Sequence, residues 1–120
     1  MRILFMGTPD FAVPTLEAVA REHEGVLVVA QPDKPAGRGI KMHAPAVAVR
    51  ARELGLPLMQ PARIRNEDAL AEMARSNADV GVVIAYGKIL PAALLEIPKH
   101  GFLNVHASVL PQWRGAAPIQ

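Results

Sequence analysis

Short apolar runs alternate along the chain with segments of helical periodicity, and this alternation predicts a parallel sheet with helices between its strands. We expect buried strands at residues 3–6, 25–30, 56–60, 79–85 and 102–106. We expect helices at residues 10–22, 44–54 and 66 to about 77. Asp10 and Asn66 are suitable N-caps, and Gly55 is a suitable stop. The order of these elements predicts an α/β fold with a Rossmann-like open, mostly parallel sheet flanked by helices.

Two segments show neither pattern. Residues 31–43 contain two prolines and two glycines, which predicts a long loop. Residues 107–120 are typical of a loop that leads into a helix start at residues 116–120. Because no strand follows that helix start, we expect the domain to be truncated before it is complete. A chain whose sheet is left partly uncovered is expected to self-associate.

Composition excludes several classes of site. The chain has 120 residues, 51% of them hydrophobic, and no cysteine, which rules out disulfides, thiolate nucleophiles and cysteine-based zinc sites. The histidines show no metal-ligand spacing, so we expect no metal. The N-terminus does not resemble a signal peptide, and no apolar run approaches the roughly 20 residues of a membrane span. We therefore expect a cytoplasmic protein that makes no contact with membranes.

Positive charge is concentrated in one part of the chain. Residues 31–65 hold seven Lys and Arg against Asp33 and Glu53, an excess of five, whereas the whole chain has a net charge of +2. We therefore expect one edge of the molecule to be electropositive, which favours an anionic ligand. Arg38 stands between Gly37 and Gly39, which free the backbone to approach a ligand, although a solvated loop charge is the simpler interpretation.

Asn104 and His106 are the most informative polar residues. Side chains two apart in a strand share a face, so both are expected on one side of the last strand, at its carboxyl end. Open α/β sheets bind ligands at that end. An amide can donate to an oxyanion while an imidazole exchanges protons near neutral pH. From spacing alone, a structural histidine hydrogen-bonded to the backbone remains the alternative.

Two further segments follow strands. Only Gly7 of the dinucleotide-binding glycine pattern is present in residues 7–10, so a plain turn is favoured there over NAD or FAD binding. Residues 86–91 form an apolar loop that either lines a pocket or buries aliphatic side chains.

Three strings resemble the catalytic domain of the methionyl-tRNA formyltransferase family, and the resemblance covers nearly the whole chain: NVHASVLPQWRGAAPIQ, MGTPDFAVPTL and QPDKPAGRG. The Asn-x-His followed by Ser-x-Leu-Pro is shared with the wider group of folate-dependent formyltransferases. The resemblance implies that Asn104 and His106 are catalytic. It implies a binding site for 10-formyltetrahydrofolate formed by Ser108, Val109, Leu110, Pro111, Tyr86, Gly87, Ile89 and Leu90. It implies contacts to the tRNA acceptor end from Lys34, Arg38 and Lys41.

The implied reaction is formyl transfer from 10-formyltetrahydrofolate to the α-amino group of methionine on initiator methionyl-tRNA, without a metal. Such enzymes also use an aspartate some tens of residues beyond Asn-x-His and a C-terminal tRNA-binding barrel domain. Neither is present here, so residues 1–120 are expected to be the N-terminal portion of the catalytic domain and inactive alone. The full-length enzyme is expected to be monomeric.

Three alternatives remain open. A glycinamide-ribonucleotide formyltransferase would share Asn-x-His but should carry a glycine-rich phosphate loop after its first strand. A sugar-nucleotide formyltransferase is closer in motif. A non-catalytic Rossmann-like binding module would leave Asn104, His106 and Arg38 without a common purpose.

Overall fold

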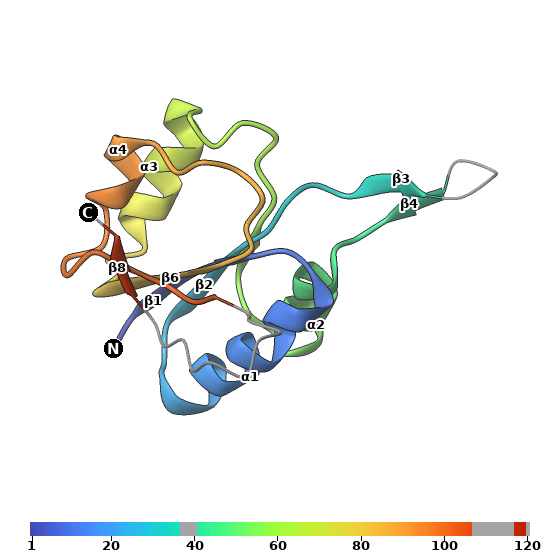
Figure 1. The fold of residues 1–120 in the computed structure, drawn as a ribbon, viewed down its shortest axis with the longest axis horizontal. Helices are drawn as coiled ribbons and strands as arrows, with labels where there is room; N and C mark the ends of the chain where they lie inside the picture. The colour runs from blue at the N-terminus through green and yellow to red at the C-terminus, as the bar shows by residue number, and fades with distance from the viewer. Residues whose placement is uncertain (37–40, 107–116, 120) are drawn as a thin grey trace.

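The computed structural model describes residues 1–36, 41–106 and 117–119, and these form a mostly parallel sheet with helices on both faces (Figure 1). The six strands follow the order β5-β2-β1-β6-β7-β8. Only β8 runs antiparallel to its neighbour. Their bounds are β1 Ile3–Gly7, β2 Val26–Val29, β5 Leu58–Met59, β6 Val80–Ile84, β7 Phe102–Asn104 and β8 Ala117–Ile119. The predicted α/β, Rossmann-like fold is confirmed.

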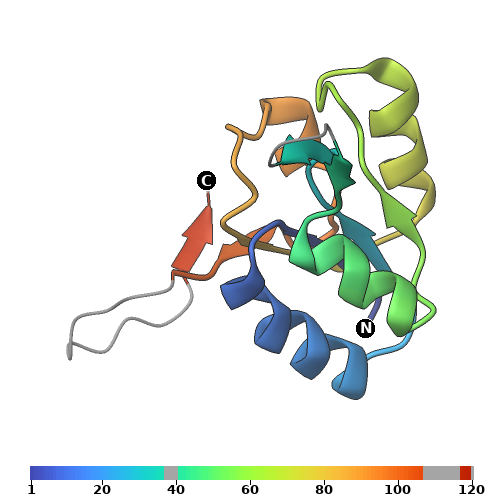
Figure 2. The same ribbon diagram turned by 90° about the vertical axis from the view of Figure 1, so that its right-hand side faces the viewer.

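The helices form two layers, one on each side of the sheet (Figure 2). One core cluster joins β1 residues Ile3 and Phe5 to the helices α1 and α2, and the other joins Leu4 and Met6 to α3 and α4. All four side chains are at most 3% exposed. This explains why β1 is a continuous apolar run, since a central parallel strand is buried on both faces. The helices are η1 Asp10–Ala12, α1 Val13–Glu22, α2 Ala46–Glu53, α3 Glu67–Arg75 and α4 Ala92–Leu95.

A glycine determines how closely β6 and β7 pack. Gly81 pairs with Phe102, and a Cβ at Gly81 would clash with the Phe102 ring. The missing side chain therefore makes room for the ring. The same pairing places Asn104 beside Val83, at the carboxyl end of the sheet.

The predicted long loop at residues 31–43 is corrected by the structure. Strands β3 (Lys34–Ala36) and β4 (Lys41–His43) pair antiparallel in a ribbon that projects from the body of the molecule (Figure 1). The sequence shows no alternation there because no face of the ribbon is buried in a core, so polar residues and a proline are tolerated. We call β3 and β4 the β3–β4 ribbon.

The predicted helix start at residues 116–120 is also wrong. Residues Ala117–Ile119 form β8, which pairs antiparallel with β7, and Pro118 lies opposite Leu103. An edge strand tolerates proline because one side of its backbone needs no partner in the sheet. The short helix α4, which begins after Pro91, was not predicted.

The two predicted caps have opposite outcomes. Asp10 does not cap a helix, because the chain enters α1 through η1, whose N-cap is Pro9. Asn66 caps α3 as predicted, and its Oδ1 accepts a hydrogen bond from the Ala69 amide at 3.1 Å.

We expect Asn66→Ala to lower the free energy of unfolding by about 1 kcal/mol, because the α3 N-terminus then loses a side-chain acceptor. Equilibrium urea denaturation measures the change. Asn66→Asp, which keeps an acceptor oxygen, is the control and should remain close to wild type. Equal loss in both variants would contradict the role of the cap.

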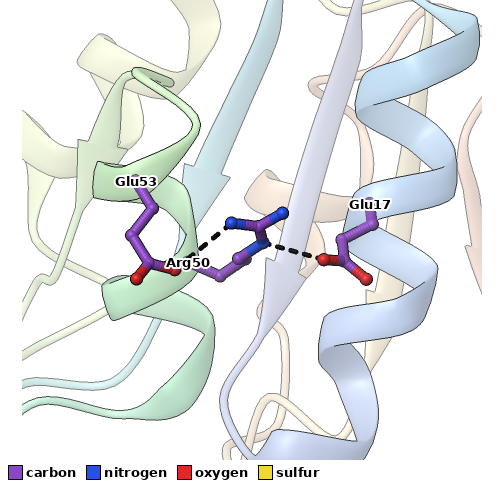
Figure 3. A network of polar contacts seen from close by, with 3 residues as sticks. All are labelled: Glu17, Arg50 and Glu53. Atoms are coloured by element: carbon purple, nitrogen blue, oxygen red, sulfur yellow. Dashed lines mark hydrogen bonds and ion pairs between the residues drawn. The ribbon is translucent and has the colours of Figure 1, made fainter.

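An arginine joins the two helices on one face of the sheet. Arg50 in α2 donates to Glu17 in α1 at 2.8 Å and contacts Glu53 at 3.3 Å (Figure 3). Two hydrogen bonds raise the pKa of Arg50 above its ordinary value, and the bond with Glu17 has a larger effect than the bond with Glu53. The ion pair between Arg50 and Glu17 therefore links α1 to α2, although partly exposed ion pairs of this kind contribute little stability.

Candidate functional site

The carboxyl end of the parallel sheet carries the polar residues that follow its strands. Thr8 follows β1, Gln31 lies two residues after β2, Tyr86 lies two residues after β6, and Asn104 ends β7. Ligands of open α/β sheets bind in the crevice outside these strand ends. The site is therefore built from segments far apart in the sequence.

The first hollow at this edge contains both predicted catalytic residues. It has a volume of about 350 Å³ and is lined by Phe11, Ala85, Asn104, Val105 and His106. We call it the Asn104 hollow. The Val105 amide donates to the Val83 carbonyl at 2.8 Å, so β6 supports the chain beyond the end of β7. His106 is exposed and Asn104 is half-buried, which leaves an amide and an imidazole accessible to a ligand.

A second hollow lies beside the first. It has a volume of about 430 Å³, and we call it the Thr8 hollow. Ala85 lines both hollows, and residues 85–88, called the 85–88 turn, all line the Thr8 hollow. Lys34 belongs to this lining and brings the start of the β3–β4 ribbon to the site. The lining is Thr8, Pro9, Gln31, Pro32, Asp33, Lys34, Ala85, Tyr86, Gly87 and Lys88.

The predicted donor-site residues after β6 differ in their placement. Tyr86 is 2% exposed and belongs to the core cluster with α3 and α4, and its carbonyl bonds to Thr8 and Gln31, which line the Thr8 hollow. Gly87 lines the hollow with a φ of +101°. Ile89 is 87% exposed, whereas Leu90 packs partly against the core.

Several predicted residues lie on the ribbon or outside the described residues. Lys34 and Lys41 are both exposed on the β3–β4 ribbon. Arg38 and the whole predicted segment Ser108, Val109, Leu110 and Pro111 fall outside the ranges that the structure describes.

Sequence reasoning missed a polar network beneath the Thr8 hollow. Gln31 is only 6% exposed, and its Nε2 donates to the Tyr86 carbonyl. Gln60 Nε2 donates to the Gln31 carbonyl and to Asp33 Oδ1, and its own Oε1 accepts from Arg52. A glutamine placed directly after the buried run of residues 28–30 was the available signal, because an uncharged polar side chain there needs a partner.

A buried hydroxyl provides a test of this part of the core. Tyr86 Oη has no hydrogen-bond partner within the described ranges, and burial raises the pKa of Tyr86 to about 12. We expect Tyr86→Phe to increase the free energy of unfolding by about 1 kcal/mol, because an unsatisfied buried polar group is removed. Urea denaturation at pH 7 measures this effect, and a loss of stability there would contradict it.

The same group predicts a pH dependence. Unfolded tyrosine loses its proton near pH 10, while folded Tyr86 keeps it until about pH 12. Between these values the unfolded state binds fewer protons, so wild-type stability should fall as the pH rises, relative to Tyr86→Phe.

No group of three or more side chains suited to a metal ion occurs within residues 1–36, 41–106 and 117–119. Nor is any helix in that part of the chain long and apolar enough to cross a membrane.

Comparisons with known proteins agree on one family. A family profile described as "Formyl transferase" matches residues 1–120. The methionyl-tRNA formyltransferase of Deinococcus radiodurans is 61% identical over 120 residues, which is 99% of this chain and 38% of that protein. Those of Sorangium cellulosum and Xanthomonas euvesicatoria are each 56% identical, cover 99% and 100% of this chain, and are matched over 38% and 39% of their own length. This chain thus spans about two fifths of these relatives.

Among solved structures, glycinamide ribonucleotide transformylase 1 from Geobacillus kaustophilus shares the fold, with a TM-score of 0.59 and 20% sequence identity. The likeness covers 96% of this chain and 63% of that one.

Proposed function

Because the chain belongs to the formyl transferase family, we propose that it forms the N-terminal portion of the catalytic domain of a longer enzyme. That enzyme transfers a formyl group from 10-formyltetrahydrofolate to the α-amino group of methionine on initiator methionyl-tRNA. The observation that carries the proposal is the meeting of Asn104 and His106 in one hollow at the carboxyl end of the sheet. The names of the relatives support this choice of substrate.

The reaction follows from the chemistry of these two side chains. The neutral amine of methionine attacks the formyl carbon and forms a tetrahedral intermediate, and the bond from that carbon to folate N10 breaks when the intermediate collapses. Asn104 donates from its amide to the oxyanion that develops, and protonated His106 supplies a second donor. The attacking nitrogen loses a proton and N10 gains one, so charge and atoms balance.

We propose that this chain does not catalyse the reaction alone. The family resemblance calls for an aspartate beyond the Asn-x-His motif to orient His106 and favour its imidazolium, in the manner of the acid that positions histidine in hydrolase triads. The aspartates of this chain all precede the motif.

The β3–β4 ribbon supports an anionic acceptor. Lys34 pairs with His43 and Ala36 pairs with Lys41 across the ribbon. Directly opposed residues and residues two apart share a face, so Lys34, Lys41 and His43 lie on the same side. A projecting ribbon with a basic face suits the phosphates of an acceptor stem, and Arg38 lies in the segment that joins its strands.

A competition assay on the longer enzyme tests the acceptor. With 10-formyltetrahydrofolate as donor, we expect formylation of initiator methionyl-tRNA and none of glycinamide ribonucleotide or of an amino-sugar nucleotide. Glycinamide ribonucleotide is a necessary comparison because the fold resembles that of a glycinamide ribonucleotide transformylase. Formylation of either small molecule in preference to the tRNA would overturn the assignment, and formylation of none would favour a binding module.

A further inference from the structure

The main-chain carbonyl of Tyr86 accepts two side-chain hydrogen bonds from different strand ends. Thr8 Oγ1, after β1, donates to it at 2.7 Å, and Gln31 Nε2, after β2, donates to it at 3.1 Å. The donors are 78 and 55 residues away from Tyr86 in the sequence. Two neighbouring strands therefore determine where this carbonyl lies.

The carbonyl belongs to a strained turn. Ala85 has a φ of +49° and Gly87 a φ of +101°, and a left-handed alanine persists only where its surroundings hold it. The Tyr86 ring is held in the core, and the two hydrogen bonds hold the carbonyl. The orientation of the 85–88 turn is thus set by contacts on both sides of the chain.

Gln31 also connects this turn to the ribbon. Its carbonyl accepts from Gln60 Nε2 at 3.1 Å, and the same Nε2 donates at 2.7 Å to Asp33, which directly precedes β3. A Cβ at Gly87 would lie 3.7 Å from the Gln31 side chain, so Gln31 packs along the turn. Gln31 is only 6% exposed, so its side chain depends on protein partners for its hydrogen bonds.

We propose that Thr8 and Gln31 are positioning residues, which hold the 85–88 turn through the Tyr86 carbonyl and thereby shape the formyl-donor side of the site. The inference rests on the proposed function and on the family resemblance, which implies that Tyr86 and Gly87 of this turn contact the reduced folate. Neither side chain takes part in the chemical step. Their loss should therefore weaken donor binding more than it slows turnover.

Substitutions of nearly the same shape test the proposal in the longer enzyme. Thr8→Val and Gln31→Met each remove one donor to the Tyr86 carbonyl, and each should raise KM for 10-formyltetrahydrofolate by about tenfold with a smaller change in kcat. Thr8→Ser keeps the hydroxyl and should restore most of the donor affinity. The double variant should raise KM further, and the single variants keep the test usable if the double variant does not fold.

Asn66→Ala is the control for a general loss of stability, because it removes the α3 cap and lies in neither hollow. It should lower the melting temperature and leave the donor KM unchanged. A donor KM that is unaffected by Thr8→Val and Gln31→Met, or that rises equally in Asn66→Ala, overturns the positioning role. The positioning role is also overturned if Thr8→Ser raises the donor KM as much as Thr8→Val does.

A second readout separates this inference from the proposed function. The amide NMR signals of Ala85 and Gly87 should shift in Thr8→Val and Gln31→Met, remain near wild type in Thr8→Ser, and require no activity. If those signals shift while wild-type enzyme formylates nothing, the proposed function fails and the turn remains positioned by Thr8 and Gln31. If wild type is active and neither the signals nor KM change, the positioning role fails alone.

Discussion

Asn104→Ala and His106→Ala, made in the longer enzyme, are expected to lower kcat by at least about 10²-fold each, the usual cost of removing one oxyanion donor. Both side chains lie in the Asn104 hollow, where an amide and an imidazole are accessible to the reacting carbonyl. Their hydrogen bonds strengthen as negative charge develops on the oxygen, so they act mainly in the transition state. Affinity for 10-formyltetrahydrofolate should stay within a few-fold of wild type.

Leu103→Ala is the matched control, because it alters the same strand on the side opposite Asn104. Single-turnover kinetics with saturating methionyl-tRNA measure the chemical step, and equilibrium titration measures folate affinity. Loss of folate affinity with kcat unchanged would show that Asn104 and His106 bind the ground state and would remove them from the chemistry.

Arg38→Ala is expected to lower kcat/KM for methionyl-tRNA by about tenfold or more, because a charge-assisted contact to phosphate is lost. In the sequence, Arg38 stands in the segment that joins the two strands of the β3–β4 ribbon, whose basic face carries Lys34 and Lys41. The slope of log affinity against log salt should become flatter by about one unit for each phosphate contact removed. Folate binding should barely change.

Arg75→Ala provides the matched change in net charge. Arg75 is exposed at the end of α3 and contributes to neither the Asn104 hollow nor the Thr8 hollow. It should leave tRNA kinetics and their salt dependence near wild type. If the two arginine variants behaved alike, the ribbon would lose its assignment and the acceptor would be undetermined.

The sequence by itself determined the elements whose signals are local. Continuous apolar runs marked β1, β2 and β6 because central parallel strands are buried on both faces, and Asn66 marked the start of α3 because a cap acts within one turn. The placement of Asn104 at the carboxyl end of the last parallel strand followed from the predicted strand and from the location of ligand sites in open sheets, whereas β7 ends at Asn104 and His106 lies two residues beyond it, where strand periodicity does not apply.

The tertiary structure alone decided which distant segments meet. Two pairings depend on backbone hydrogen bonds: Lys34–Ala36 with Lys41–His43, and Ala117–Ile119 with β7. Backbone hydrogen bonds form with almost any side chain, so such edge strands leave no periodic pattern in the sequence. The convergence of Thr8 and Gln31 on the Tyr86 carbonyl likewise requires β1 to lie between β2 and β6. Side-chain patterns report burial along one element, whereas these contacts arise from the order in which the elements pack.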